Sequence, residues 1–295
     1  ISDVTQQICD ILEYASLASG MHIASGFFFP SEREISKEYA EEMSKKYRAR
    51  VENVCTDKKV ISNAADVNRW LNDVDIESGK NYAEACLQHG LDTVLLSLID
   101  IRTSLPRGVS KKIEFRGRRC SLALKMFSFR KFKVIPYYED EYVQMVGIPL
   151  NADTSFRMFV ILPKQANRFE QYENFMTGKK IVKLLSSMWY HKVEVSIPKF
   201  NISDQHDLTE KLEHLQIPEM IGSEKHFQRI SEEPFNSLLI LHSVRLSFVE
   251  TMVMDDCEEE SDVDNAPPLS FVADSPFLYL MTRNQTVVLV GRVEP

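Results

Sequence analysis

Apolar and polar positions alternate in long blocks over the last quarter of the chain, residues 239–295. Two apolar blocks, Leu239–Leu241 and Val244–Glu250, together predict one buried strand. Two later apolar runs, Phe277–Met281 and Val287–Val290, are separated by a short polar segment, a spacing typical of a β-hairpin. The chain is therefore expected to end in strands that contribute to a core.

The stretch between these strands, Thr251–Pro268, is dominated by acidic residues. Seven carboxylates lie between Asp255 and Asp264. Like charges at this density repel one another and keep a segment extended and hydrated. A polar segment held at both ends by buried strands is exposed between them, and exposed loops on a rigid scaffold often carry function. There are two interpretations: an inert surface insertion, or a segment presented to the binding cleft of a partner.

Helical periodicity marks several segments upstream. Apolar positions predict a short helix over Asp3–Leu12. Ser31 and Glu34 have the spacing of a capping box, which predicts a helix from there to about Arg50. Further helices are predicted from apolar residues three and four positions apart: Asn63–Val74, Tyr82–Gln88, the stripe of Ile181, Leu184, Leu185, Met188 and Trp189, and the segment marked by Leu208, Leu212 and Leu215.

Continuous or alternating apolar runs predict strands elsewhere. Tyr14–Phe29 is expected to be a central strand, and Leu91–Ile101 a strand covered on both faces. The other predicted strands are several antiparallel ones within residues 113–146, then Phe156–Leu162 and Val193–Ile197. Because helices and strands are intermixed without regular βαβ alternation, the predicted class is α+β around large sheets, in one domain over residues 1–295.

Composition narrows the functional classes. Hydrophobic residues make up 44% and charged residues 26% of the 295 positions, as in an ordinary soluble globular protein. The net charge of −8 argues against nucleic acid as a partner, because phosphate attraction dominates that affinity. Basic runs at residues 111–112, 116–119 and 130–133 have two interpretations: solvated strand faces, or a site for an anionic polysaccharide.

The sequence contains conflicting signals for the cellular compartment of the protein. The five cysteines, at positions 9, 55, 86, 120 and 257, lack metal or dithiol spacing and suit free thiols in a reducing compartment. Two N-glycosylation sequons, Asn201-Ile202-Ser203 and Asn284-Gln285-Thr286, suit a secreted protein. No apolar run reaches the length of a membrane span, and the opening residue Ile1 indicates that the natural N-terminus lies upstream. We expect a secreted glycoprotein, with the cytoplasm as the alternative.

Recognisable catalytic and metal-binding patterns are missing from the sequence. The seven histidines include no H-E-x-x-H pair, and none stands beside a cysteine at ligand spacing. There is neither a G-x-S-x-G elbow nor a phosphate-binding G-x-x-x-x-G-K-[ST] loop. We therefore expect a protein that is not an enzyme and that uses neither a metal nor another cofactor.

The C-terminal segment resembles a known signature. Phe271–Tyr279, followed by Val288–Pro295, closely resembles the serpin pattern Phe-x-Ala-Asp-His-Pro-Phe-Leu-Phe and Gly-Arg-Val-x-x-Pro, with Ser275 in place of the His. Further segments resemble serpin motifs in the same order as in that family: Val67–Leu71, Arg157–Pro163, Ser196–Phe200 and Phe248–Glu250. The resemblance implies a serpin fold, in which helices surround large mixed and antiparallel sheets and a reactive-centre loop is exposed.

The resemblance also implies a function. An inhibitory serpin is a suicide substrate: a serine protease cleaves the loop and is held as an acyl-enzyme while the loop inserts as a new central strand. For the reactive bond we favour Asp256–Cys257, which would suit a protease that cuts after acidic residues. The alternative bond is Asp264–Asn265. The expected partner is a target serine protease, bound by a monomeric inhibitor.

The chain departs from the family pattern at the hinge of this loop. Inhibitors carry small, Ala-rich residues directly after the Phe-x-Glu motif, whereas Glu250 is followed here by Thr251. The first helices of the family and this hinge are both missing from the chain as written. There are two hypotheses: the full protein contains a hinge and inhibits a protease, or the chain is a non-inhibitory serpin that serves as a carrier, a chaperone or a decoy substrate.

Overall fold

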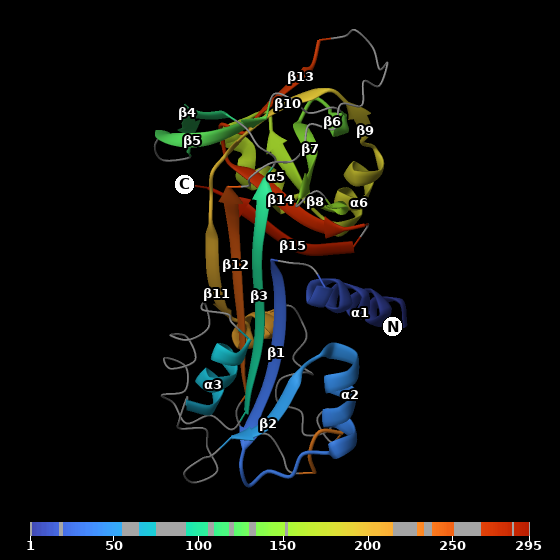
Figure 1. The fold of residues 1–295 in the computed structure, drawn as a ribbon. Coiled ribbons are helices and arrows are strands. Elements are labelled where there is room, and N and C mark those ends of the chain that lie inside the picture. The colour runs from blue at the N-terminus through green and yellow to red at the C-terminus, as the bar shows by residue number, and fades with distance from the viewer. Residues whose placement is uncertain are drawn as a thin grey trace. The chain divides into compact units, whose positions relative to one another are not determined.

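The computed structural model describes residues 2–17, 20–54, 65–74, 93–105, 109–117, 121–129, 134–150, 153–214, 229–232, 238–250, 267–284 and 286–294. The chain divides into two compact units: Ile1–Arg102 with Asn201–Ser247, and Thr103–Phe200 with Phe248–Pro295. Figure 1 shows the helices and strands of both. The expectation of a single domain stays a prediction.

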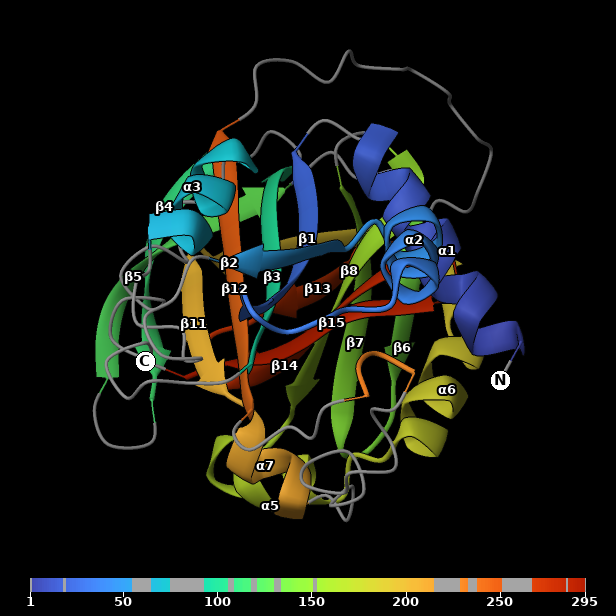
Figure 2. The same cartoon turned by 90° about the horizontal axis from the view of Figure 1, so that it is seen from below.

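The first unit contains a five-stranded sheet in the order β11-β12-β3-β1-β2 (Figures 1 and 2). Strand β1 is antiparallel to β3 and parallel to β2, and β11 is antiparallel to β12. Strands β3 and β12 are each 13 residues long and continue into the second unit. The strands are β1 Met21–Pro30, β2 Arg50–Val54, β3 Thr93–Leu105, β11 Ile202–Asp207 and β12 Leu238–Glu250.

Helix α3, Ala65–Asp73, packs on one face of this sheet and confirms the amphipathic helix predicted there. The rings of Phe28 and Trp70 meet edge to face, with centroids 5.3 Å apart. Gly26 makes room for this contact, because a Cβ there would lie 2.6 Å from the Phe28 ring and 3.0 Å from that of Trp70. The buried cluster comprises Phe28, Val54, Val67, Trp70, Leu71, Val94, Leu96, Leu98, Leu239 and Leu241.

Strand β3 contains the strand predicted over Leu91–Ile101, and all 13 of its residues are buried or half-buried. Val94, Leu96 and Leu98 are at most 5% exposed beneath α3. Their neighbours Ser97 and Ile99, which point to the opposite face, are only half-buried. Farther along the strand, Ile101, Thr103 and Leu105 point to that same opposite face and are at most 4% exposed. Both faces are therefore covered, as predicted, each most closely over a different part of the strand.

The N-terminal helix shortens the central strand predicted over Tyr14–Phe29, which is confirmed only from Met21 onward. Helix α1 spans Ser2–Leu17, and β1 begins only at Met21. Leu12 and Ala15, three residues apart, are both buried, so helical spacing continues through Tyr14. Gly20 precedes the strand with a left-handed φ of 98°, a conformation that glycine adopts without steric cost.

Helix α2, Lys37–Tyr47, begins later than predicted, and Ser31 is not its N-cap. Ser36 takes that role, since its Oγ accepts a hydrogen bond from the Tyr39 backbone N–H at 3.3 Å. Ser31 instead belongs to a turn that follows β1, closed by the bond from the Arg33 N–H to the Pro30 carbonyl. The helix also ends before Arg50, which opens β2 by parallel pairing with Gly26 of β1.

The second unit contains two sheets. One has six strands in the order β15-β14-β8-β7-β6-β9, all antiparallel, and the other has four strands in the order β13-β10-β5-β4. The antiparallel strands predicted within residues 113–146, the strand over 156–162 and the C-terminal hairpin are confirmed. The strands are β4 Val109–Arg116, β5 Ser121–Phe129, β6 Ile135–Glu139, β7 Val143–Leu150, β8 Asp153–Pro163, β9 Trp189–His191, β10 Val193–Pro198, β13 Leu269–Val272, β14 Phe277–Arg283 and β15 Thr286–Val293.

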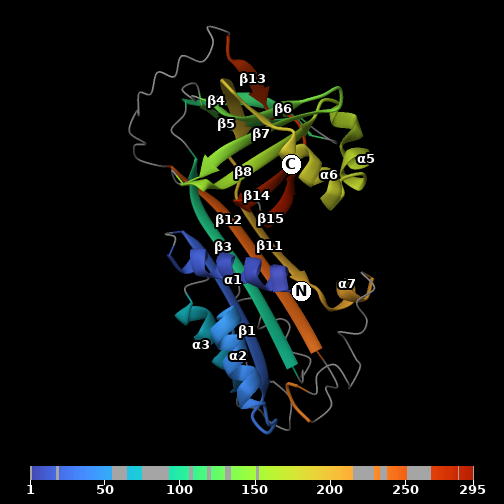
Figure 3. The same ribbon diagram turned by 90° about the vertical axis from the view of Figure 1, so that its right-hand side faces the viewer.

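Helices α5, Phe169–Asn174, and α6, Gly178–Ser186, lie on one face of the six-stranded sheet (Figure 3). Phe169 and Leu184 enter a core with Val143, Met145, Phe159, Ile161, Leu278 and Leu280. Trp189 does not continue the helical stripe as predicted. Helix α6 has ended at Ser186, and Trp189 opens strand β9, where it pairs with Tyr137 and is 75% exposed.

The remaining short elements are η2, Ala166–Arg168, and α7, Thr209–His214. Helix α7 confirms the helix predicted around Leu212, while the turn predicted over Tyr82–Gln88 lies outside the described residues. Among the helices that the structure describes, none is long and apolar enough to cross a membrane.

Candidate functional site

The candidate site is the segment that joins β12 to β13. The predicted reactive-bond residues, Asp256 and Cys257 with the alternative Asp264 and Asn265, lie outside the described residues. The structure does provide the strand on each side of this segment. Strand β12 ends at Glu250, and the described chain resumes at position 267, two residues before β13.

The end of β12 is fixed by aromatic packing within the second unit. Phe248 is 6% exposed, and its ring lies edge to face with that of Phe200 at 5.0 Å. Phe200 also contacts the rings of Phe277 and Tyr279, at 5.9 and 5.7 Å. Such ring pairs stabilise a site beyond simple burial of area, so the end of β12 has a firm base.

The far end of the segment is fixed by main-chain pairing. Strand β13 runs parallel to β10, and the N–H of Leu269 donates to the Lys192 carbonyl at 2.8 Å. The N–H of Ala273 donates to the Ser196 carbonyl at 2.9 Å. Phe271 and Ala273 are fully buried. The chain beyond the loop is therefore held in place by a strand and its core.

A double link to β4 holds the segment after β13. The Arg116 guanidinium lies 2.7 Å from the Asp274 carboxylate, and the Arg116 N–H donates to the Asp274 carbonyl, also at 2.7 Å. The ion pair is largely exposed, so it adds little stability by itself. Its effect is to orient the turn that joins β13 to β14.

The base of β12 lies directly beside β3, with no strand between them (Figure 1). A side-chain contact links the two strands: His242 Nδ1 is 3.1 Å from Ser97 Oγ. On the other side, His242 stands directly opposite His206 of β11. His206 is itself held by Asp204, 2.9 Å from its Nε2, and by Lys211, 2.9 Å from its Nδ1.

Burial lowers the pKa of His242, and the neighbouring His206 lowers it further. The contact with Ser97 and the charge of Asp204 act in the opposite direction. His242 is thus held preferentially in its neutral form, in which one ring nitrogen donates and the other accepts.

Sequence reasoning missed these contacts for different reasons. Phe200 lies in a matched segment, so its importance was accessible from the sequence. The meeting of His242 with Ser97, and of Arg116 with Asp274, joins positions 145 and 158 residues apart. A local sequence pattern does not indicate which distant residues will be in contact.

Of the predicted basic runs, the one at residues 130–133 lies outside the described residues. In the other two, the structure describes Lys112 and Arg116, whose side chains are exposed. Lys112 stands directly opposite Lys125 in the pairing of β4 with β5. Lys199 adjoins them, because its N–H donates to the Lys125 carbonyl at 2.8 Å. Its Nζ lies 5.6 Å from the centroid of the Phe127 ring, on the face of β5 that carries Lys125. Lys112 of β4, Lys125 of β5 and Lys199, directly after β10, form a row that is termed here the lysine row.

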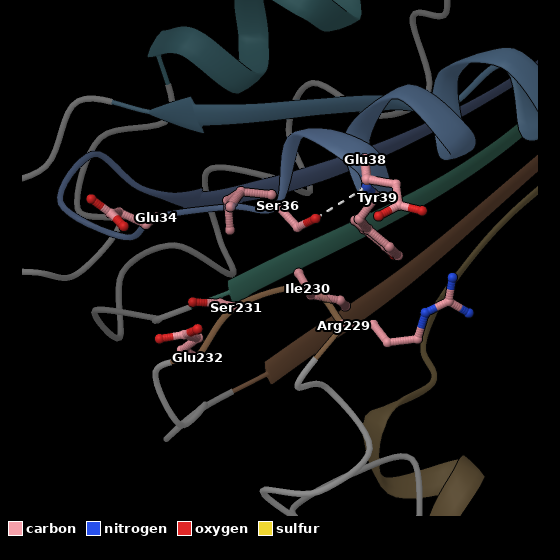
Figure 4. A pocket seen from close by; sticks show the side chains of 9 residues that line it. Glu34, Ser36, Glu38, Tyr39, Arg229, Ile230, Ser231 and Glu232 are labelled. Atoms are coloured by element: carbon pink, nitrogen blue, oxygen red, sulfur yellow. Dashed lines mark hydrogen bonds between the residues drawn. The ribbon is translucent and has the colours of Figure 1, made fainter.

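A pocket of about 560 Å³ lies in the first unit, between the start of α2 and residues 229–232 (Figure 4). Two of its hydroxyl groups, those of Ser36 and Tyr39, are poorly suited to nucleophilic chemistry. Ser36 Oγ is engaged as the helix cap. Burial, together with the charge of Glu42, raises the pKa of Tyr39 to about 12. Within the described ranges, no group of three or more His, Cys, Asp or Glu side chains is placed to hold a metal ion.

Comparison with known proteins places these features in a family. The family model described as Serpin (serine protease inhibitor) matches residues 110–295, more than half of the chain. Serpin I2 of Homo sapiens is 26% identical over 147 residues, which are 47% of this chain and 36% of that protein. Serpin B5 of Xenopus tropicalis is 25% identical over 197 residues, 62% of this chain and 51% of that protein. The matched region thus spans about a third to a half of these relatives.

A solved structure has the same fold as this chain. A crystal structure of native protease nexin-1 with heparin superimposes with a TM-score of 0.75 and 18% identity, over 99% of this chain and 82% of that one. The α+β class and the serpin fold predicted from the sequence are both confirmed. Serpins are generally protease inhibitors rather than enzymes. The chain belongs to the serpin family.

Proposed function

We propose that this chain acts on a serine protease as a suicide substrate, with the segment between β12 and β13 as its reactive-centre loop. The observation that supports this most strongly is the arrangement of the five-stranded sheet. Strand β12 leads directly into the loop and has β3 as its immediate neighbour. A cleaved loop that folds back beside β12 would therefore enter between β12 and β3 as a new central strand.

The length of these neighbours bears on the reactive bond. A strand as long as the 13 residues of β3 extends over about 43 Å. Cleavage at Asp256–Cys257 would leave six residues, Thr251–Asp256, which reach only about 20 Å. Cleavage at Asp264–Asn265 would leave 14, which suffice. Asp256–Cys257 therefore requires additional hinge residues after Glu250, whereas Asp264–Asn265 does not.

The charge of the loop weighs against the longer insertion. Alternate residues of an inserted strand face opposite sides of the sheet. On the α3 side, the flanking residues Leu96, Leu98 and Leu241 are at most 5% exposed. Carboxylates between Asp255 and Asp264 that faced this side would each cost several kcal/mol unless protonated. We therefore retain Asp256–Cys257, with a hinge in the full protein, as the favoured bond.

The competing proposal is a non-inhibitory serpin that serves as a carrier, a chaperone or a decoy substrate. It is supported by the direct junction of Glu250 with Thr251, which leaves out the small residues of an inhibitory hinge. Both proposals share the scaffold and differ in the fate of the protease after it cleaves the loop. They are distinguishable by whether the protease is trapped.

Incubation with an acid-preferring serine protease tests the proposal. Inhibition is expected to give an equimolar complex that resists SDS, and Asp256→Ala should abolish both cleavage and complex. Asp264→Ala is the matched control and should leave them unchanged. Cleavage without any complex would reject inhibition in favour of the carrier or decoy. An intact mass of the purified protein equal to 34.0 kDa would falsify the hypothesis that the full protein contains additional hinge residues.

We propose an anionic polysaccharide as a second partner, bound at the lysine row. Like charges directly opposite one another in a sheet are destabilising, so the pair of Lys112 and Lys125 favours a compensating anion. Glu114 is exposed on the same face, opposite Ala123, and offsets part of this charge. The protease nexin-1 structure named above contains heparin, an anionic polysaccharide.

Retention on a heparin column tests this partner. Replacing Lys112 and Lys125 together by Gln should lower the salt concentration needed for elution. The control replaces Lys179 and Lys183, which are exposed on α6, and should elute as the parent does. If both variants eluted at the same salt concentration, the lysine row would be rejected as the binding site. Competition by single-stranded DNA at the same strength would show non-selective binding of polyanions.

We further propose that the protein is secreted and glycosylated. The proposal rests on the two sequons at Asn201 and Asn284, whose acceptor side chains are both exposed. Fractionation of the producing cells tests it. The protein is expected in the medium, and confinement to the cytosol would reject it.

A further inference from the structure

The two sequons share a position in the fold that the sequence does not reveal. Asn201 stands one residue before β11, which is the edge strand of the five-stranded sheet as described. Asn284 stands in the turn that leads into β15, which is the edge strand of the described six-stranded sheet. Each acceptor thus lies at the beginning of a strand whose outer side meets no further strand in its described sheet.

The first acceptor lies on an accessible surface. Asn201 and Ser203, which supply the amide and the hydroxyl of the sequon, are both exposed. They are two residues apart along an extended chain and so point to the same side. Strand β11 is exposed over most of its length and carries Asp204 and Asp207, charges of the kind that discourage pairing at a sheet edge.

The second acceptor lies on a defined turn. Asn284 has a left-handed φ of 53°, a conformation that Asn tolerates better than most residues. Its N–H donates to the Ser155 carbonyl at 2.6 Å, which holds the turn against β8. Its side chain is exposed.

Strand β15 has the greater need of protection. Val287 is 43% exposed and Val290 is 58% exposed. Open edges with β-branched apolar residues are templates for pairing with a second chain. Arg292, held by Glu173 at 2.9 Å, is the single basic side chain on this strand. A bulky polar group at the start of the strand would keep another strand from aligning with it.

We propose that Asn201 and Asn284 each carry an N-linked glycan, and that the glycans shield the two sheet edges from pairing with another chain. In the modification, the amide nitrogen of Asn forms a bond to the anomeric carbon of a lipid-pyrophosphate-linked oligosaccharide. The bond from that carbon to the pyrophosphate breaks, and the amide proton is lost. The inference rests on the proposed secretion of the protein, and it does not depend on protease inhibition.

Peptide mass spectrometry of the secreted protein tests occupancy. Enzymatic release of N-glycans is expected to convert Asn201 and Asn284 to Asp, a gain of about 1 Da at each. Asn201→Gln and Ser203→Ala should each remove the first glycan, and Asn284→Gln and Thr286→Val the second. The hydroxyl variants serve as matched controls because they keep the Asn side chain. Recovery of both unmodified Asn peptides from secreted protein would overturn the proposal.

Association under mild heating tests the shielding role. Light scattering is expected to rise earlier for the Asn284→Gln variant than for the parent, and further for the double variant. Enzymatic deglycosylation of the parent should reproduce the double variant, which excludes an effect of the substitutions themselves. Unchanged association after deglycosylation would overturn the shielding role. If no complex with a protease formed, the results of these glycan experiments would not change. The proposal of protease inhibition and the proposal of glycan shielding can therefore fail separately.

Discussion

His242 illustrates how one side chain depends on its neighbours across a sheet. It touches Ser97 on one side and faces His206 and Asp204 on the other. Its pKa is lowered in the folded state, mainly by burial. In the unfolded chain it returns to an ordinary value of about 6.5. The unfolded state therefore binds a proton more readily, and the folded state loses stability as pH falls below about 6.5.

We expect the parent protein to lose more stability between pH 8 and pH 5.5 than a His242→Gln variant. The reason is that Gln cannot take up the proton that favours unfolding. Urea unfolding at both pH values measures this difference. The prediction would be contradicted if the parent and the variant lost equal stability, because the titration would then lie elsewhere.

Gly26 is a residue whose role depends on the space above it. A Cβ there would meet the rings of Phe28 and Trp70, which occupy the centre of the core beneath α3. Gly26→Ala is expected to destabilise the protein by about 1–3 kcal/mol, the usual cost of overpacking. Gly178→Ala is the matched control, since nothing lies within 4 Å of its added methyl group. Equal unfolding midpoints for the two variants would refute this account.

At the scale of elements, helix α2 has two candidate N-cap residues: Ser31, predicted from the sequence, and Ser36, found in the structure. Ser36→Ala is expected to cost about 0.5–2 kcal/mol, because it removes the acceptor for the Tyr39 N–H. Ser31→Ala should cost less, since Ser31 lies in the preceding turn. Thermal unfolding of the two variants decides between them. A larger loss for Ser31→Ala would restore the cap predicted from the sequence.

Strand β13 places one fully buried side chain in the core, in addition to its main-chain bonds to β10. Phe271 is fully buried, whereas Leu269 on the same strand is 37% exposed. Phe271→Ala is expected to cost about 3–5 kcal/mol, and Leu269→Ala distinctly less. Chemical denaturation measures both. Similar losses would mean that the strand is held by its main-chain bonds to β10 rather than by its core.

For the whole molecule, cleavage of the loop is the decisive perturbation. If the cleaved loop inserts between β12 and β3, new main-chain pairing and burial are expected to raise the melting temperature. Differential scanning calorimetry before and after cleavage measures this shift. The same experiment on a Val253→Asp variant serves as a control. Its melting temperature should rise less on cleavage, because a further charge should oppose insertion. An unchanged melting temperature on cleavage of the parent would support a decoy or a carrier.

The sequence alone determined those features that depend on local periodicity. Alternation and apolar runs placed β8, β10, β12 and the β14–β15 hairpin, and helical spacing placed α3. Motif order from Val67 to the C-terminus identified the family, which the match to the family model confirmed. These succeed because the side-chain period of a strand or a helix is set by the backbone of that segment.

The tertiary structure decided which segments meet. The alternation of apolar and polar residues indicates which face of a strand is apolar, but it does not indicate which strand will lie beside it. Only the fold placed β12 next to β3, brought His242 to Ser97 and Arg116 to Asp274, and set both sequons at sheet edges. It also moved the helix cap from Ser31 to Ser36, because Arg33 closes a turn on Pro30 before the helix begins. Pairing and capping of this kind depend on contacts between distant or competing groups, and local sequence does not encode their outcome.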